Sequence, residues 1–284
     1  MLKKHQLRGS LIDMATGNHR GARLGQHFLT ARWAAVALAR AASVREGETI
    51  IEIGPGKGAL TRELLATTSP IIAIEKDLAL VEKLHETFAL EISNGQLRII
   101  AGDVRDCMIE NEHIKNYILG NYVVAANIPY YITGEIIRQF LTATTQPRAM
   151  ALLIQKEVAQ RITSKKESIL SLSVKAYGTP KIIEKVSRKS FSPAPSVDSA
   201  ILLIEKISRD FFADVDEERF FAVVHAGFAS KRKFLANNLA VNFNKTKVER
   251  ALVIAHIDQK ERAENVSLVQ WKLLTQTLIG MTPS

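Results

Sequence analysis

The chain has 284 residues, and 46% of them are hydrophobic, so it can bury a full core; one large domain with a smaller one is the expected organisation. Its net charge of +9 favours a polyanionic partner such as nucleic acid, although an anionic membrane surface or a plain solvated surface would also suit it. No apolar run is long enough to span a bilayer, and the basic start lacks the apolar segment of a secretory signal. The single Cys107 and the scattered histidines argue against a disulfide or a metal site, so we expect a cytoplasmic protein without metal.

The N-terminal stretch is the most unevenly charged part of the chain. Residues 1–32 hold six basic residues and a single acid, Asp13, which is a net charge of +5. Such an arm favours contact with a phosphate backbone. We therefore expect a basic arm over residues 1–21, a main domain over 22–207 and a further domain over 208–284.

From Thr49 onward, short apolar runs alternate with helical patterns in the manner of α/β folds. The sequence predicts strand Thr49–Ile53, helix Ala59–Ala66, strand Ile71–Glu75, helix Leu78–Leu90, strands Leu97–Ala101 and Tyr122–Ala126, helix Gly134–Leu141 and strand Met150–Ile154. An antiparallel pair, Lys181–Val186 with Ser199–Glu205, should close the sheet. Strand patterns cease past Ile207, and helices with breaks near residues 237–244 and 257–258 are expected from Phe211 onward.

A glycine-rich turn follows the first strand of this series. Three alternating glycines lie in Gly54–Gly58, directly after Glu52, where they permit a tight turn and close approach of a ligand to the backbone. Glu75 ends the next strand, 21 residues after Gly54, where an acid can bind both hydroxyls of a ribose. Asp103, after the third strand, could accept the amino group of an adenine or merely cap a helix. An ordinary glycine turn is the alternative, but this pattern favours a nucleoside cofactor, and its spacing suits S-adenosylmethionine better than a nicotinamide.

The segment after the fourth strand, Asn127-Ile128-Pro129-Tyr130, predicts a site for a flat base. Pro129 holds the preceding residue extended, so that its carbonyl can point at a ligand beside the Asn127 amide. Two acceptors and the ring of Tyr130 suit an exocyclic amino group such as N6 of adenine. Further along, Phe191 begins a proline-stiffened loop and could clamp a flipped base opposite Tyr130. A capped turn with aromatic packing is the alternative for both segments.

A short basic run, Lys231-Arg232-Lys233, has apolar neighbours on both sides within residues 226–239. This pattern indicates a helix that lays positive charge on phosphates. A solvated helix face is the alternative, because it is the usual meaning of three adjacent charges.

Taken together, these motifs resemble those of the ribosomal RNA adenine dimethyltransferases, in particular the small-subunit branch of that family. The resemblance covers the chain from about residue 22 to the C-terminus. It is carried by the segments Gly25–Leu29, Glu52–Gly58, Asn127–Tyr131, Gln155–Val158 and Phe191–Ala200.

The resemblance implies a Rossmann-like methyltransferase sheet with a small all-helical C-terminal domain. It also implies that a set of residues contacts the cofactor S-adenosylmethionine: His27, Leu29, Gly54, Gly56, Glu75, Asp103 and Asn127. His27 stands where asparagine is often found in the family; an imidazole can also donate one hydrogen bond and accept another.

The implied reaction is transfer of methyl groups to N6 of two adjacent adenosines near the 3′ end of 16S RNA in the small ribosomal subunit. We expect a monomer with Asn127, Ile128, Pro129, Tyr130 and Phe191 at the catalytic centre. One alternative is a methyltransferase that acts on adenine in 23S RNA of the large subunit or in DNA. The other is a ribosome assembly factor that keeps the fold without the activity.

Overall fold

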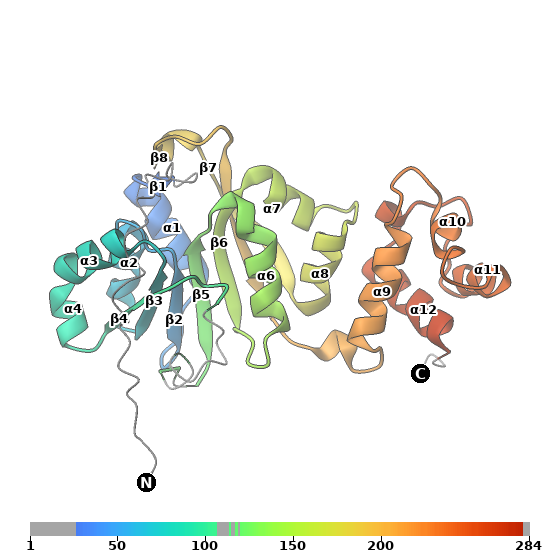
Figure 1. Cartoon of the computed structure of the whole chain (residues 1–284), viewed down its shortest axis with the longest axis horizontal. Coiled ribbons are helices and arrows are strands. Elements are labelled where there is room, and N and C mark those ends of the chain that lie inside the picture. The colour runs from blue at the N-terminus through green and yellow to red at the C-terminus, as the bar shows by residue number, and fades with distance from the viewer. Residues whose placement is uncertain (1–26, 107–113, 115–116, 119, 281–284) are drawn as a thin grey trace, which may run out of the picture.

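The computed structural model describes residues 27–106, 114, 117–118 and 120–280 (Figure 1). The basic arm expected over residues 1–21 lies outside the described residues. In the described part of the chain, no helix is long and apolar enough to cross a membrane, and no group of three or more acidic, histidine or cysteine side chains is placed to hold a metal ion.

A seven-stranded sheet with the strand order β4-β3-β2-β5-β6-β9-β7 forms the centre of the molecule (Figure 1). Neighbouring strands from β4 to β6 pair in parallel, whereas β9 pairs antiparallel with both β6 and β7. The strands of the sheet are β2 (Thr49–Ile53), β3 (Ile71–Glu75), β4 (Leu97–Ala101), β5 (Tyr122–Asn127), β6 (Ala149–Gln155), β7 (Thr179–Val186) and β9 (Ser199–Glu205). The predicted strands and the closing antiparallel pair are therefore confirmed, with the α/β fold class.

Helices cover both faces of the sheet, which explains why the central strands are apolar at nearly every position. Ile50 packs with Leu38 and Leu64 on one face, and Ile51 packs with Ile136 on the other. Helices of the sheet part are α1 (Arg32–Ala42), α2 (Ala59–Leu64), α3 (Leu78–Thr87), α4 (Ala89–Ser93), α6 (Thr133–Thr142), α7 (Lys156–Thr163) and α8 (Ile169–Tyr177). Short 3₁₀ turns lie at η1 (Leu65–Thr67), η2 (Tyr130–Ile132), η3 (Arg188–Ser190), η4 (Asp210–Phe212) and η5 (Ala263–Asn265).

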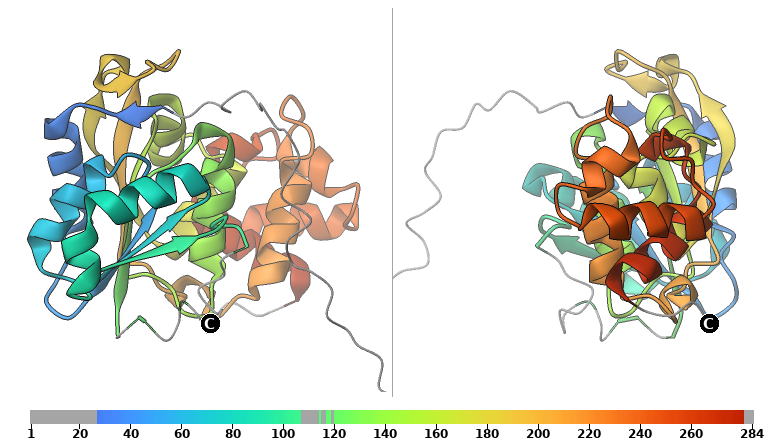
Figure 2. Two further views of the ribbon diagram at one scale, coloured as in Figure 1. Left: turned by 60° about the vertical axis from the view of Figure 1, so that its left-hand side comes forward. Right: turned by 90° about the vertical axis from the view of Figure 1, so that its right-hand side faces the viewer.

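After β9, the structure is helical, and the last four helices gather at one end of the sheet (Figures 1 and 2). These helices are α9 (Glu217–Gly227), α10 (Leu235–Leu239), α11 (Lys245–Ile254) and α12 (Leu268–Ile279). The expected break near residues 257–258 is confirmed, whereas the one expected near 237–244 is confined to 240–244, because α10 continues to Leu239. Trp271 of α12 is fully buried and packs against Gly227, where a Cβ atom would lie 2.4 Å from the indole. The close approach of α9 to α12 thus requires a glycine at this position.

The predicted helix across Lys231-Arg232-Lys233 is wrong. These three residues form an exposed turn between α9 and α10. The side-chain amide of Asn238 donates to the carbonyls of Gly227 (2.6 Å) and Ser230 (3.0 Å). The first bond satisfies the carbonyl of the last residue of α9 and the second holds the turn that follows it, so the helix ends before the basic run.

Candidate active site

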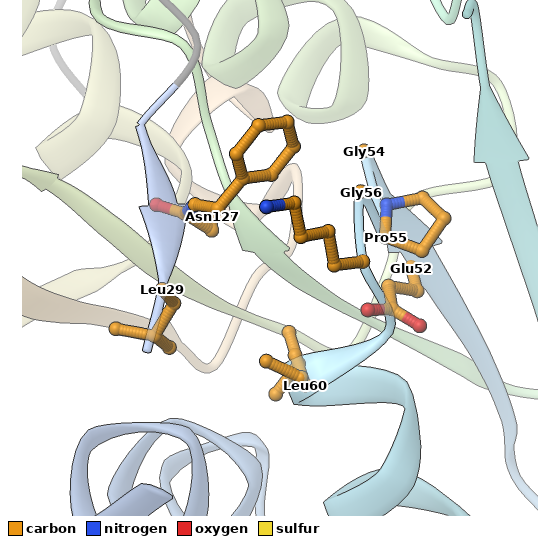
Figure 3. Close-up of a pocket in the computed structure, with 10 residues that line it drawn as sticks. Leu29, Glu52, Gly54, Pro55, Gly56, Leu60 and Asn127 are labelled. Atoms are coloured by element: carbon orange, nitrogen blue, oxygen red, sulfur yellow. The ribbon is translucent and has the colours of Figure 1, made fainter. Parts of the chain in front are cut away.

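A cavity of about 900 Å³ opens at the carboxyl ends of β2, β3, β4 and β5. This is the edge at which open α/β sheets bind their ligands, and the volume is within the range of small-molecule sites. Most of the predicted site residues line it: His27, Gly54, Gly56, Glu75, Asp103, Asn127, Ile128, Pro129, Tyr130 and Phe191. A small neighbouring cavity shares Phe28, Gly54, Gly56 and Asn127 with it and also holds Leu29 in its wall (Figure 3).

The glycine loop between β2 and α2 bends in a way that side chains would oppose. Gly54 has a φ of 64° and Gly56 a φ of 58°, both in the left-handed region that favours glycine. A Cβ atom on Gly56 would also lie 3.1 Å from the ring of Phe28. The bare backbone of the loop therefore faces both cavities, as expected for a loop that approaches a ligand closely.

The carboxylate of Glu75 is buried, and the residues that the structure describes use only about half of its acceptor positions. Its Oε2 accepts from the Gly56 amide (3.0 Å), and its Oε1 accepts from the Asp77 amide (2.9 Å). A carboxylate offers about four acceptor positions, so roughly one on each oxygen is left for a ligand. This arrangement fits two ribose hydroxyls, and it explains how Glu75 also fixes the glycine loop.

The carboxylate of Asp103 is fully used within the protein. Its Oδ1 accepts from the amide and from Nε of Arg105, both at 3.0 Å. Its Oδ2 accepts from Nη2 of Arg105 (2.6 Å) and from Nζ of Lys76 (2.9 Å). The Arg105 guanidinium, with Lys76, holds the pKa of Asp103 well below its usual range, so the group stays ionised. The sequence did not predict Lys76 and Arg105 as site residues, although each is within two positions of a predicted one.

A second buried acid, Glu52, lies beside the glycine loop at the small cavity (Figure 3). It is 1% exposed, and among the described residues neither carboxyl oxygen has a partner in good hydrogen-bond geometry, although the side chain and backbone of Thr61 lie beside it. Burial raises the pKa of Glu52 to about 8; Thr61 acts in the opposite direction, and the Glu75 carboxylate adds to the rise. Glu52 is therefore a neutral acid at pH 7.

Asn127 at the end of β5 keeps its side-chain oxygen available. Its Nδ2 donates to the carbonyl of His27 (3.2 Å), which turns the amide oxygen away from that bond. Ile128 is fixed by its own amide, which donates to the carbonyl of Leu153 (3.2 Å). Neither Asn127 Oδ1 nor the Ile128 carbonyl accepts a hydrogen bond from the residues that the structure describes. Two neighbouring acceptors are thus held in place without a partner.

Tyr130 is half-buried and anchored through its hydroxyl, which is hydrogen-bonded to Oγ of Ser199 (2.9 Å). Burial is the main cause that raises the pKa of this phenol, so it is uncharged. The imidazole of His27 lies 5.9 Å from the tyrosine ring at an angle of 33°, and its Nδ1 donates to the carbonyl of Pro193 (2.8 Å). Because the hydroxyl is engaged, the ring face is what Tyr130 can offer a base.

The expectation that a free loop presents Phe191 is wrong. Phe191–Ser192 is strand β8, which pairs antiparallel with β1 (Phe28–Leu29). The side chain of Phe191 is 5% exposed and packs in the core on the α1 side of the sheet. Pairing with β1 draws the ring into this core, so Phe191 offers the large cavity only a small part of its surface.

The rim of the large cavity carries two exposed apolar side chains, Leu78 and Tyr131, each 67% exposed. Rings and aliphatic chains left in water at a cavity mouth are typical of ligand-binding grooves. Tyr131 belongs to the Asn127–Tyr131 segment that the sequence placed at the site, although no role was assigned to it, whereas Leu78 was not predicted. The sheet, the glycine loop and this edge together form the ligand-binding edge of a Rossmann-like α/β fold.

Comparison with known proteins identifies the family. The model of the family "Ribosomal RNA adenine dimethylase" matches residues 17–279. Ribosomal RNA small subunit methyltransferase A of Dehalococcoides mccartyi is 39% identical over 90% of this chain and 88% of its own length. Its counterpart from Moorella thermoacetica is 37% identical, covering 89% and 91%. The chain therefore belongs to the ribosomal RNA adenine dimethylase family and is an enzyme that methylates adenine in ribosomal RNA.

Solved structures agree with this assignment. The 23S rRNA methyltransferase ErmE superposes with a TM-score of 0.72 at 26% identity, covering 89% of this chain and 99% of its own. A dimethyladenosine transferase from Plasmodium falciparum has a TM-score of 0.73 at 23% identity, covering 87% and 96%, and supports the fold.

Proposed function

We propose that the chain transfers methyl groups from S-adenosylmethionine to N6 of two adjacent adenosines near the 3′ end of 16S RNA in the small ribosomal subunit. The observation that carries the proposal is a pair of acceptors, Asn127 Oδ1 and the Ile128 carbonyl, beside the face of Tyr130, to which none of the described residues donates. Relatives at 35–39% identity bear the small-subunit name, which favours this substrate over 23S RNA.

The residues at the cavity fit the proposed cofactor, which supplies an activated methyl group when bound. Glu75 has an acceptor position left on each oxygen for the ribose hydroxyls. Gly54 and Gly56 leave room for close approach, and His27 and Asp103 complete the same wall. Leu29 is buried in the wall of the adjoining small cavity, and we include it among the proposed cofactor contacts because that cavity shares Gly54, Gly56 and Asn127 with the large one.

The protein contributes position and charge stabilisation rather than a covalent intermediate. The lone pair on N6 of adenine is delocalised into the ring, so the nitrogen is a poor nucleophile. Hydrogen bonds from N6 to Asn127 Oδ1 and to the Ile128 carbonyl concentrate that lone pair and orient it. The face of Tyr130 holds the base by stacking. Phe191 supports the wall behind it from the core.

For the RNA partner, we propose contacts from the exposed turn Lys231-Arg232-Lys233 and from the basic residues 1–21. A helical domain from about residue 208, a monomeric state and a cytoplasmic location complete the proposal.

Methyl transfer from labelled S-adenosylmethionine to three substrates tests the proposal: unmethylated small subunits, 23S RNA and DNA. We expect label in the small-subunit RNA alone, and in adenines near its 3′ end. Label in 23S RNA alone would assign the chain to the other branch. Binding to small subunits without label in any substrate would identify a non-catalytic assembly factor.

A further inference from the structure

The two acids that face the cofactor side of the cavity differ in what they can still accept. Glu75 holds two backbone amides and keeps about two acceptor positions. Asp103 holds four donors, two on each oxygen, and keeps none. A ligand amino group can therefore bind Asp103 only if one of these donors leaves.

Lys76 is the donor that leaves most easily. It contributes a single bond through Nζ, and its side chain is 67% exposed. Arg105 contributes three bonds to the same carboxylate, one of them from its backbone, and a further nitrogen lies 4.0 Å from Glu135 of α6. A bidentate guanidinium is also the stronger partner, whereas a solvated ammonium gives up one bond at little cost.

We propose that Lys76 controls access to the adenine site. In the free protein its ammonium group occupies Oδ2 of Asp103, and the 6-amino group of the cofactor's adenine displaces it; we call this arrangement the latch. The proposal rests on the proposed use of S-adenosylmethionine and adds a residue that determines its affinity and base selectivity. A purine with an amino group at C6 replaces the Lys76 bond with its own N–H donor. A purine with a carbonyl at C6 brings an acceptor toward the carboxylate, and its only donor on that side, N1–H, is not at the C6 substituent that replaces the Lys76 bond.

The proposal predicts that removal of the Lys76 ammonium group strengthens binding of the cofactor. An exposed ion pair contributes up to about 1 kcal/mol, so Lys76→Met should bind S-adenosylhomocysteine about two- to fivefold more tightly than the wild type. S-inosylhomocysteine, with a carbonyl at C6, should gain nothing. Lys76→Arg keeps a cation and a donor and, because a guanidinium is the stronger partner, should bind no more tightly than the wild type. Raising the salt concentration should shrink the gap between Lys76→Met and the wild type, because salt screens the exposed pair.

Calorimetric titration of the full chain with both ligands measures these affinities. Lys181→Met is the matched control, since Lys181 forms an exposed pair with Glu205 (3.0 Å) on β7 and β9, outside the cavity lining. Circular dichroism confirms that each variant is folded. Unchanged or weaker binding of S-adenosylhomocysteine by Lys76→Met would overturn the latch, as would an equal gain for S-inosylhomocysteine. Failure of the wild type to bind S-adenosylhomocysteine would instead overturn the proposed function.

Discussion

The two sides of the large cavity use their oxygen acceptors in opposite ways. After β5, Asn127 Oδ1 and the Ile128 carbonyl accept nothing from the described residues, because each group is anchored through its nitrogen instead. After β3 and β4, the Glu75 carboxylate is half used and the Asp103 carboxylate is fully used. The first arrangement is ready for a nucleophile that must be oriented. In the second arrangement, a ligand donor must compete with donors of the protein for the same carboxylate oxygens. The affinity for the ligand at Glu75 and Asp103 therefore depends on how strongly those protein donors are held.

The largest expected effect is a loss of reaction rate, and we expect it at Asn127, on the β5 side of the cavity. Asn127→Ala should lower the single-turnover rate of methyl transfer by about 10²–10³, the usual loss when a group aimed at a reacting centre is removed. The measurement uses saturating cofactor and unmethylated small subunits. A wild-type rate for this variant would mean that the amide only caps a turn.

On the cofactor side, Glu75→Gln should weaken binding of S-adenosylmethionine about tenfold to a hundredfold. The substitution removes a charge and one of the two oxygens, and hydrogen bonds to charged groups contribute about 1.5–3 kcal/mol. Calorimetric titration measures the change, with Glu205→Gln as a control outside the cavity. Unchanged affinity would remove Glu75 from the cofactor site.

Tyr130 tests whether the free-acceptor side needs a ring or a hydroxyl. Tyr130→Ala loses stacking of about 1–3 kcal/mol and should be about tenfold to a hundredfold slower. Tyr130→Phe loses only the bond to Ser199, about 0.5–1.5 kcal/mol, and should keep most of the activity. Ser199→Ala should resemble Tyr130→Phe, and the double variant should be no slower than either. Equal losses for the Phe and Ala variants of Tyr130 would contradict the stacking role.

The buried acid Glu52 should make the free energy of unfolding depend on pH. The native protein retains this proton up to about pH 8, whereas the unfolded chain releases it above about pH 4.5. Stability should therefore fall as pH rises between these values, by up to about 1.4 kcal/mol per pH unit. Glu52→Gln should match the wild type near pH 4 and exceed it in urea unfolding at pH 8. An identical pH slope for both proteins would show that Glu52 is ionised.

The smallest change is expected far from both sides of the cavity. Replacement of Lys231, Arg232 and Lys233 by alanine should flatten the salt dependence of RNA binding by about one unit of slope for each phosphate that these side chains neutralise. Cofactor affinity should stay unchanged because these residues lie outside the cavity lining. A wild-type slope would show that the turn is only solvated.

The sequence alone determined the sheet and the location of its functional edge. Apolar runs report which segments are buried on both faces, so the seven strands of the central sheet were predicted correctly, whereas the short pair β1 and β8 was not predicted. The glycine turn and the Asn127–Tyr130 segment were also recognisable, because glycine and proline restrict the backbone locally. Since parallel strands share one carboxyl edge, residues at their ends had to lie near one another.

Only the tertiary structure decided which partner each polar group has. Asp103 is saturated because Lys76, from another strand end, reaches it. Phe191 is buried because β8 pairs with β1, and the run after α9 is a turn because Asn238 caps that helix. Such outcomes depend on contacts between segments far apart in the chain, whereas sequence patterns report local conformation and average exposure. For the same reason, the sequence placed the acids at the right edge but did not show which of them still had room for a ligand.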